Sequence, residues 1–301
     1  MMKVAGFTFV RNAVRFDYPV VESILSILSL CDEFIVALGN SEDGTRDLIA
    51  SIRSPKIRII DTQWNDSLRA GGRTLALETE KALGGISSGT DWAFYLQADE
   101  VVHEQYLPVI RRAMEQWCHD KRVEGLLFRY LHFWGLYEYV GTSRNWYRNE
   151  VRIVRPGPGI QSWKDAQGFR IQGRKLRVVS IPAYIFHYGC VKPPALQQAK
   201  QESFNRYWHD DDWIKKHVAD TDQYDYSVMD MLRLYEGTHL AVMADRIARK
   251  DWEFKPESLR QHRGWVRRIL HWFEYRTGIR IGEYRNYVEL RNTLKIANVY
   301  P

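Results

Sequence analysis

Short apolar runs alternate with amphipathic segments along the first third of the chain. Val4 to Val10 is an apolar run that ends in polar residues, which predicts a strand followed by a loop. Between Val20 and Cys31 the apolar residues recur three or four positions apart, the spacing of one helix face. Glu33 to Leu38 is a second apolar run. This order of strand, helix and strand predicts the beginning of a parallel sheet.

The same alternation continues as far as Leu107. A loop of turn-forming residues, Gly39 to Thr45, precedes a helix that runs through Ile52. Ile57 to Ile60 predicts a third strand, and Thr74 to Leu83 predicts a further helix. Together these elements predict a three-layer α/β domain with a mixed, mostly parallel sheet.

One further apolar run ends in two acids. Trp92 to Leu96 has the length and composition of a strand that is buried on both faces. Asp99 and Glu100 follow it and would lie at the carboxyl edge of the sheet, where open α/β folds bind their ligands. Carboxylates at that edge suit Mg²⁺ or Mn²⁺ holding a phosphate. Alternatively, the two acids cap a helix that begins near Val101.

The composition indicates a globular protein. With 301 residues, 45% of them hydrophobic and 13% aromatic, the chain can bury a large core. A formal charge of +6 is compatible with phosphorylated ligands, anionic lipid or nucleic acid. Cys31, Cys118 and Cys190 form no CxxC pattern, which favours a reducing, cytoplasmic setting. The sequence has no signal-like start and no apolar run near the ~18 residues of a membrane span, so we expect a soluble or peripheral protein.

Several motifs of nucleotide and metal sites are absent from the sequence. No GxGxxG follows the first strand, and neither GxxxxGK[ST] nor HExxH occurs. A dinucleotide fold and a phosphate loop of the ATPase kind are therefore unsupported.

Four segments in the first two thirds of the chain resemble family 2 glycosyltransferases, which have the GT-A fold. Phe9-Val10-Arg11-Asn12 is similar to the family's nucleotide-binding start, and Ile35 to Thr45 to its second strand and the loop after it. Gly71-Gly72-Arg73 resembles its arginine-bearing segment, and Leu96 to Glu100 falls where the family has its Asp-x-Asp metal motif. The resemblance implies that a nucleotide sugar contacts Phe9, Arg11, Asn12, Gly39, Asp43, Arg73, Gln97 and Asp99.

Two positions depart from the family's pattern. The acid that often contacts the nucleobase would lie at Leu38 or Gly39, and neither can supply one, so the nucleotide preference stays open. Gln97 replaces the first acid of Asp-x-Asp, and an amide is a poor ligand for a hard cation. Asp99 would carry the metal largely alone. Either the diphosphate and a second side chain complete that site, or no metal is needed.

The second half of the chain offers residues for the chemistry. The resemblance implies that Asp165 is the general base and that His187, at the end of a later strand, is a metal ligand together with Asp99. Glu150 and Glu100 are the alternative bases. His187 is also compatible with a hydrogen-bonded core residue.

The resemblance implies transfer of a sugar from a nucleotide-sugar donor to a glycan or lipid-linked acceptor, with inversion, as in cell-envelope polysaccharide biosynthesis. A divalent metal ion, together with Arg11 and Arg73, would neutralise the departing diphosphate. Several aromatic residues could form a platform for sugar rings, or could equally belong to the core. They are Trp134, Tyr137, Tyr139, Trp146 and Trp163.

We expect a catalytic domain over residues 1–192, with a nucleotide-binding half (1–107) and an acceptor half (108–192), and then a helical region over 193–301. Between Ser258 and Tyr275 apolar residues recur near helical spacing beside several arginines. Such a helix suits an anionic membrane surface, which would place the enzyme at the inner face of the cell membrane. It also suits packing on the catalytic domain with a solvated basic face.

Two other functions stay open. A catalytically silent relative would bind a nucleotide sugar or a glycan without turnover, as Gln97 and the missing nucleobase acid allow. A nucleic-acid-binding protein is compatible with the basic charge, but the first two thirds contain no recognisable binding module, so we expect no nucleic-acid partner.

Overall fold

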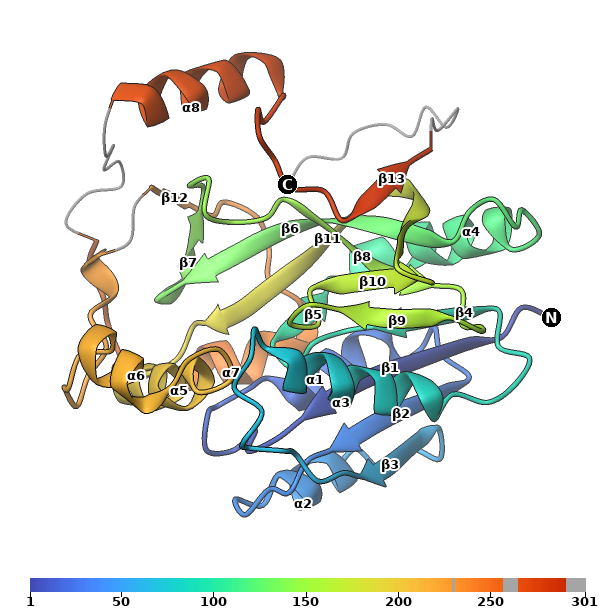
Figure 1. The fold of residues 1–301 in the computed structure, drawn as a ribbon, viewed down its shortest axis with the longest axis horizontal. Coiled ribbons are helices and arrows are strands. Elements are labelled where there is room, and N and C mark those ends of the chain that lie inside the picture. Colours follow the sequence, from blue (N-terminus) through green and yellow to red (C-terminus); the bar gives the residue numbers. More distant parts are fainter. Residues whose placement is uncertain (229–230, 257–264, 291–301) are drawn as a thin grey trace.

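A mixed sheet of 13 strands runs through the molecule, with helices on both of its faces (Figure 1). The computed structural model describes residues 1–228, 231–256 and 265–290. The main strand order is β3-β2-β1-β4-β8-β6-β11-β10-β9. This architecture confirms the predicted α/β class.

The first half of the sheet is parallel. Its strands are β1 (Val4–Val10), β2 (Glu33–Leu38), β3 (Ile57–Asp61) and β4 (Trp92–Tyr95). Successive side chains of a strand point to opposite faces, so the apolar residues of each strand serve two cores. Phe34 and Phe94 belong to the core that includes α1 (Val20–Leu28), whereas Ile35 and Tyr95 belong to the core that includes α3 (Arg73–Gly84). The short helix α2 (Thr45–Ala50) links β2 to β3.

The second half of the sheet is mainly antiparallel. Its path consists of β8 (Asn149–Val154), β6 (Gly125–Trp134), β11 (Arg174–Cys190), β10 (Gly168–Ile171) and β9 (Ile160–Trp163). The neighbours β6 and β11 are parallel, while β8 pairs antiparallel with both β4 and β6. Four short strands join at the sides, namely β5 (Glu100–Val102), β7 (Leu136–Gly141), β12 (Leu232–Leu234) and β13 (Tyr287–Glu289).

The remaining helices surround this sheet. They are α4 (Leu107–Trp117), α5 (Pro194–Asn205), α6 (Asp211–His217), α7 (Ala244–Ala248) and α8 (Trp265–Thr277), with 3₁₀ turns η1 (Glu104–Tyr106), η2 (Tyr226–Val228) and η3 (Ala241–Met243). Helix α8 stands apart from the sheet (Figure 1), and Glu274 ties it to Arg144 by a 2.8 Å ion pair. No helix in the described ranges combines the length and the apolar character that crossing a membrane requires.

The structure contradicts the alternative that Asp99 and Glu100 cap a helix beginning near Val101. Val101 and Val102 are buried in β5, which pairs antiparallel with β11, and helix α4 begins only at Leu107. Asp99 and Glu100 therefore do not cap a helix. Two valines in succession suit a strand that is buried on both faces, because branched side chains pack well on a pleated surface.

Candidate functional site

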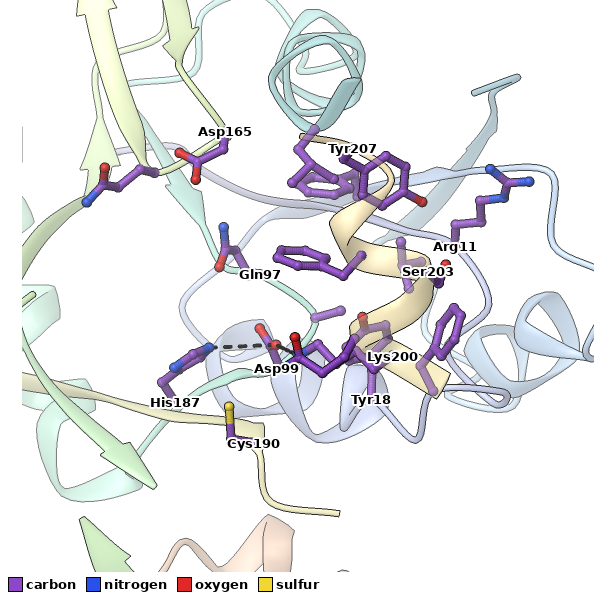
Figure 2. A pocket seen from close by; sticks show the side chains of 18 of the residues that line it. Arg11, Tyr18, Gln97, Asp99, Asp165, His187, Cys190, Lys200, Ser203 and Tyr207 are labelled. Carbon is purple, nitrogen blue, oxygen red and sulfur yellow. Dashed lines mark hydrogen bonds and ion pairs between the residues drawn. The ribbon is translucent and has the colours of Figure 1, made fainter. Parts of the chain in front are cut away.

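A cavity of about 400 Å³ lies at the carboxyl ends of β1 and β4, and α5 forms one of its walls (Figure 2). Its position agrees with the edge of the sheet at which open α/β folds bind ligands. Six of the residues predicted for the site line it, namely Phe9, Arg11, Gln97, Asp99, Asp165 and His187. The remaining four, Asn12, Gly39, Asp43 and Arg73, are not part of the lining.

Asn12 and Asp43 hold the loops beside the cavity in shape. The backbone N–H of Asn12, which has a left-handed φ of 55°, donates to the Ser41 hydroxyl at 2.9 Å. The Asp43 carboxylate accepts from the backbone N–H groups of Arg15 (2.7 Å) and Thr45 (3.2 Å). These contacts join the end of β1 to the loop after β2.

Two glycines in the predicted segments allow another side chain to lie against the backbone. A Cβ atom on Gly39 would lie 2.4 Å from the indole Nε1 of Trp64, so the missing side chain lets this tryptophan reach the cavity. A Cβ atom on Gly72, which has a φ of 69°, would lie 2.5 Å from the Cβ of Asp165. Arg73, the next residue, is exposed at the start of α3.

Asp99, His187 and Lys200 form a charged cluster on one side of the cavity (Figure 2). The Asp99 Oδ2 atom lies 3.6 Å from His187 Nε2 and 3.4 Å from Lys200 Nζ. Burial alone would raise the pKa of the Asp99 carboxyl, but His187 and Lys200 lower it below its ordinary value. Asp99 is therefore an anion at neutral pH.

A chain of hydrogen bonds fixes the orientation of the His187 ring. His132 Nε2 lies 2.8 Å from the carbonyl oxygen of Tyr147 and must donate to it, and burial keeps the pKa of His132 well below its ordinary value. In the neutral ring the Nδ1 atom of His132 is then an acceptor, so the Nδ1–H of His187, 2.9 Å away, donates to it. His187 thus turns Nε2 toward Asp99.

This arrangement fits a divalent metal ion that shares its coordination sphere with a ligand. Asp99 and His187 present one oxygen and one nitrogen from side chains whose orientation is fixed. The described ranges contain no cluster of three or more His, Cys, Asp or Glu residues that could hold a metal ion by themselves. Any ion at this pair would need oxygens from a bound molecule, as Mg²⁺ commonly takes from substrate phosphates.

The opposite end of the cavity is aromatic. The rings of Phe9 and Trp64 lie 5.8 Å apart, and those of Trp64 and Tyr207 lie 5.5 Å apart. The guanidinium of Arg11 lies 5.7 Å from the Trp64 ring centre and pairs with Asp66. An aromatic wall beside a cation suits a flat heterocycle that carries a phosphate.

Asp165 lies in the turn between β9 and β10 and faces the cavity across Gln97 (Figure 2). Its neighbours Lys164 and Ala166 both have left-handed backbones, with φ of 55° and 64°. Such conformations are costly for residues with side chains and occur often at functional sites. Burial raises the pKa of Asp165, and the Gln97 amide donates to the carbonyl oxygen of Ala166 at 3.5 Å.

The two alternative bases lie outside the cavity lining. Glu100 is fully buried and makes a two-point ion pair with Arg152, at 2.7 and 2.8 Å, and it accepts a hydrogen bond from the Tyr130 hydroxyl. Glu150 is also buried and accepts from the Gln167 amide at 2.9 Å. Burial raises the pKa of Glu150 to about 8.

The aromatic residues considered as a sugar platform do not line the cavity. Trp134 and Tyr137 are buried in the core, and the Trp146 ring stacks on His132 with 4.8 Å between ring centres. The Trp163 ring lies 4.4 Å from the Arg170 guanidinium, and Tyr139 packs against Phe254. These contacts indicate packing roles.

Sequence reasoning did not find the wall that α5 provides. Gln197, Lys200, Gln201 and Phe204 line the cavity, followed by Tyr207 just after the helix. Gln197, Lys200, Gln201 and Phe204 stand at positions i, i+3, i+4 and i+7, so these four share one helix face. That spacing was visible in the sequence, but nothing in it indicated which surface the face would cover.

Comparison of the sequence with protein-family models and with curated proteins finds no match. The fold is similar to that of TarS from S. aureus, with a TM-score of 0.38 and 15% identity over 67% of this chain and 38% of that one. It is also similar to glucosyl-3-phosphoglycerate synthase from Mycobacterium tuberculosis, crystallised with Mn²⁺, UDP-glucose and glycerol 3-phosphate. That TM-score is 0.30, with 17% identity over 44% of each chain.

A third similar structure is the 4-diphosphocytidyl-2C-methyl-D-erythritol synthase of Anaerococcus prevotii DSM 20548. Its TM-score is 0.33, with 10% identity over 52% of this chain and 70% of that one. The matches cover less than half of the TarS and glucosyl-3-phosphoglycerate synthase chains. At these identities and TM-scores the likeness concerns the fold and not the activity.

Proposed function

We propose that the protein transfers a sugar from a nucleotide-sugar donor to an acceptor hydroxyl, as the sequence resemblance to family 2 glycosyltransferases implies. The observation that carries the proposal is the division of one cavity into three parts. An aromatic wall lies at Trp64, a charged cluster lies around Asp99, and a carboxylate reaches the cavity from a separate loop at Asp165.

In this proposal the nucleobase packs against the aromatic wall and the diphosphate extends toward the charged cluster. Asp99 and His187 would hold a divalent ion, Mn²⁺ or Mg²⁺, which stabilises the negative charge of the departing diphosphate when it is bound. Lys200 and Arg11 add fixed positive charge near the same path. Gln97, just after β4, holds the loop of Asp165 in place by donating to the carbonyl oxygen of Ala166.

Asp165 is the proposed general base. The acceptor oxygen bonds to the anomeric carbon of the sugar while the bond from that carbon to the phosphate oxygen breaks, and its electron pair leaves with the diphosphate. The hydroxyl proton passes to the Asp165 carboxylate. Attack from the face opposite the leaving group inverts the configuration at the anomeric carbon.

A ligand screen tests this function. Thermal unfolding is measured with UDP-, GDP-, dTDP- and CMP-sugars, each with Mn²⁺, Mg²⁺ or chelator, and any stabilising donor is then assayed for release of free nucleotide. We expect at least one donor both to stabilise the protein and to be turned over with a suitable acceptor. Stabilisation without turnover would favour the silent binding relative, and no stabilisation by any donor would contradict the proposal.

We also propose that the acceptor is carried by a membrane lipid and that the protein works at the inner face of the cell membrane. Trp265, Ile269 and Trp272 lie on one face of α8 and are exposed by 73%, 56% and 60%. Exposed tryptophans on a helix with arginines in its sequence suit an anionic lipid surface. Residues 258–264 of the predicted membrane helix lie outside the described residues.

A further inference from the structure

We propose that Lys200 has two successive partners: the Asp99 carboxylate in the free protein, and the donor diphosphate once the donor is bound. The inference rests on the proposed function and adds a residue that the sequence resemblance does not supply. It also makes metal binding depend on the donor, because Lys200 occupies the oxygen that a metal ion would use.

The geometry puts one oxygen at the centre of the cluster. Asp99 Oδ2 is the atom 3.4 Å from Lys200 Nζ, and it is also the atom 3.6 Å from His187 Nε2. Lys200 Nζ donates a shorter bond, 2.8 Å, to the backbone carbonyl oxygen of Gly189. The ammonium is therefore anchored to β11 and only loosely paired with the carboxylate.

Electrostatics then sets an order of binding. A divalent ion at Asp99 Oδ2 would stand close to the Lys200 ammonium, and two cations at that separation repel strongly in a partly buried site. A diphosphate in the cavity gives the ammonium a new anionic partner, and the bonds to Gly189 and Asp99 use two of the three N–H donors of a lysine ammonium. The flexible side chain of lysine can turn to it without moving the helix.

The position of Lys200 supports a role toward a ligand in the cavity. Lys200 lines the cavity and lies on the same face of α5 as Gln197 and Phe204. A purely structural lysine that fastens α5 to β11 would need only the Gly189 carbonyl. The two roles predict different effects on metal binding.

The test measures Mn²⁺ alone by electron paramagnetic resonance, and UDP, GDP and dTDP by calorimetry in EDTA. In Lys200→Met we expect Mn²⁺ affinity to rise at least threefold, because the competing cation is gone. We expect affinity for the nucleoside diphosphate that binds wild type to fall at least tenfold. Lys216→Met, which removes an exposed lysine of α6, is the matched control and should change neither affinity.

Lys200→Gln keeps a hydrogen-bond donor without the charge and is used if Lys200→Met does not fold. Mn²⁺ affinity that is unchanged or lower, or unchanged nucleotide affinity, would overturn the inference, as would failure of both variants to fold. If wild type binds none of the three nucleotides with Mn²⁺ or with EDTA, the proposed function fails too. If wild type binds a nucleotide but the two affinities do not move in opposite directions, only the inference about Lys200 fails.

Discussion

The Oδ2 atom of Asp99 and the Nε2 atom of His187 lie 3.6 Å apart because Gly189 has no side chain. A Cβ atom at Gly189 would lie 2.6 Å from the first of these atoms and 2.7 Å from the second. No carbon atom is accommodated at such distances without displacing one of the two side chains. The glycine two residues after His187 is thus part of the geometry of the proposed metal pair.

Gly189→Ala should therefore separate Asp99 from His187. We expect Mn²⁺ affinity, measured in the presence of the donor nucleotide, to fall at least tenfold, and turnover to fall with it. Gly157→Ala is the matched control, because a Cβ at Gly157 meets no atom within 4 Å and should leave both quantities unchanged. A Gly189→Ala protein with wild-type Mn²⁺ affinity would show that Asp99 and His187 do not act together on a metal ion.

His132→Phe should weaken metal binding although His132 does not line the cavity. The phenylalanine ring retains the stacking with Trp146 but cannot accept the His187 Nδ1–H, so His187 loses the partner that fixes its tautomer. Loss of such a supporting hydrogen bond commonly costs about 10- to 100-fold in metal affinity. Nucleotide affinity in EDTA should be unchanged, and a fall in that affinity as well would indicate a general disturbance of the cavity.

Asp165→Asn should reduce turnover by roughly a hundredfold or more while donor affinity persists, the range expected for loss of a general base. Because burial raises the pKa of Asp165, the wild-type turnover number should fall with decreasing pH through a midpoint above the ordinary value of 3.8. The variant should lose this dependence. Reduced donor affinity with turnover preserved would instead make Asp165 a binding residue, and unchanged kinetics would return the role of base to Glu150.

Glu150 should make the protein less stable as the pH rises. Burial raises its pKa from 4.5 to about 8, so the folded protein keeps a proton that the unfolded chain releases above about pH 4.5. The free energy of unfolding should then fall by about 1.4 kcal/mol for each pH unit within this range. Urea unfolding at pH 5, 6.5 and 8 should show this loss in wild type relative to Glu150→Gln. Parallel curves for the two proteins would mean that Glu150 is ionised in the fold.

The exposed face of α8 should bind anionic vesicles. Replacement of Trp265, Ile269 and Trp272 by serine should abolish sedimentation with vesicles that contain an anionic phospholipid, without changing turnover of a water-soluble acceptor. Equal sedimentation of the wild-type protein with neutral and anionic vesicles would remove the anionic surface from the proposal.

The sequence predicted the first half of the fold closely. The apolar runs at β1, β2, β3 and β4 are short, bounded by turn residues and separated by helical patterns, so local rules identify each of them. Local rules fail where pairing is long-range. Strand β11 continues past Ile181 and Pro182 because its pairing with β6 resumes after an irregular register, which the apolar pattern of the chain does not predict.

Residues of the site could be predicted where their order along the chain was sufficient to identify them. They could not be predicted where the packing of distant segments brings them together. The family resemblance paired Asp99 with His187 by their order along the chain, and the structure brings them within 3.6 Å. Lys200 reaches Asp99 because helix α5 packs beside the cavity. His132 reaches His187 because strands β6 and β11 pair in that register. No local sequence pattern encodes either contact. The role of Gly189 depends on a residue 90 positions earlier in the chain, so no sequence window around it reveals the contact.

The buried ion pair of Glu100 and Arg152 fixes the short strand that follows Asp99. Glu100 belongs to β5 and Arg152 to β8, and neither side chain has any contact with solvent. Removing either partner would leave an uncompensated charge in the interior, at a cost of about 3 to 5 kcal/mol. The segment after Asp99 therefore cannot detach from β8 while the sheet remains folded. We expect Asp99 to keep its place after β4 until the sheet itself unfolds, so that the cavity and the fold are lost in one transition.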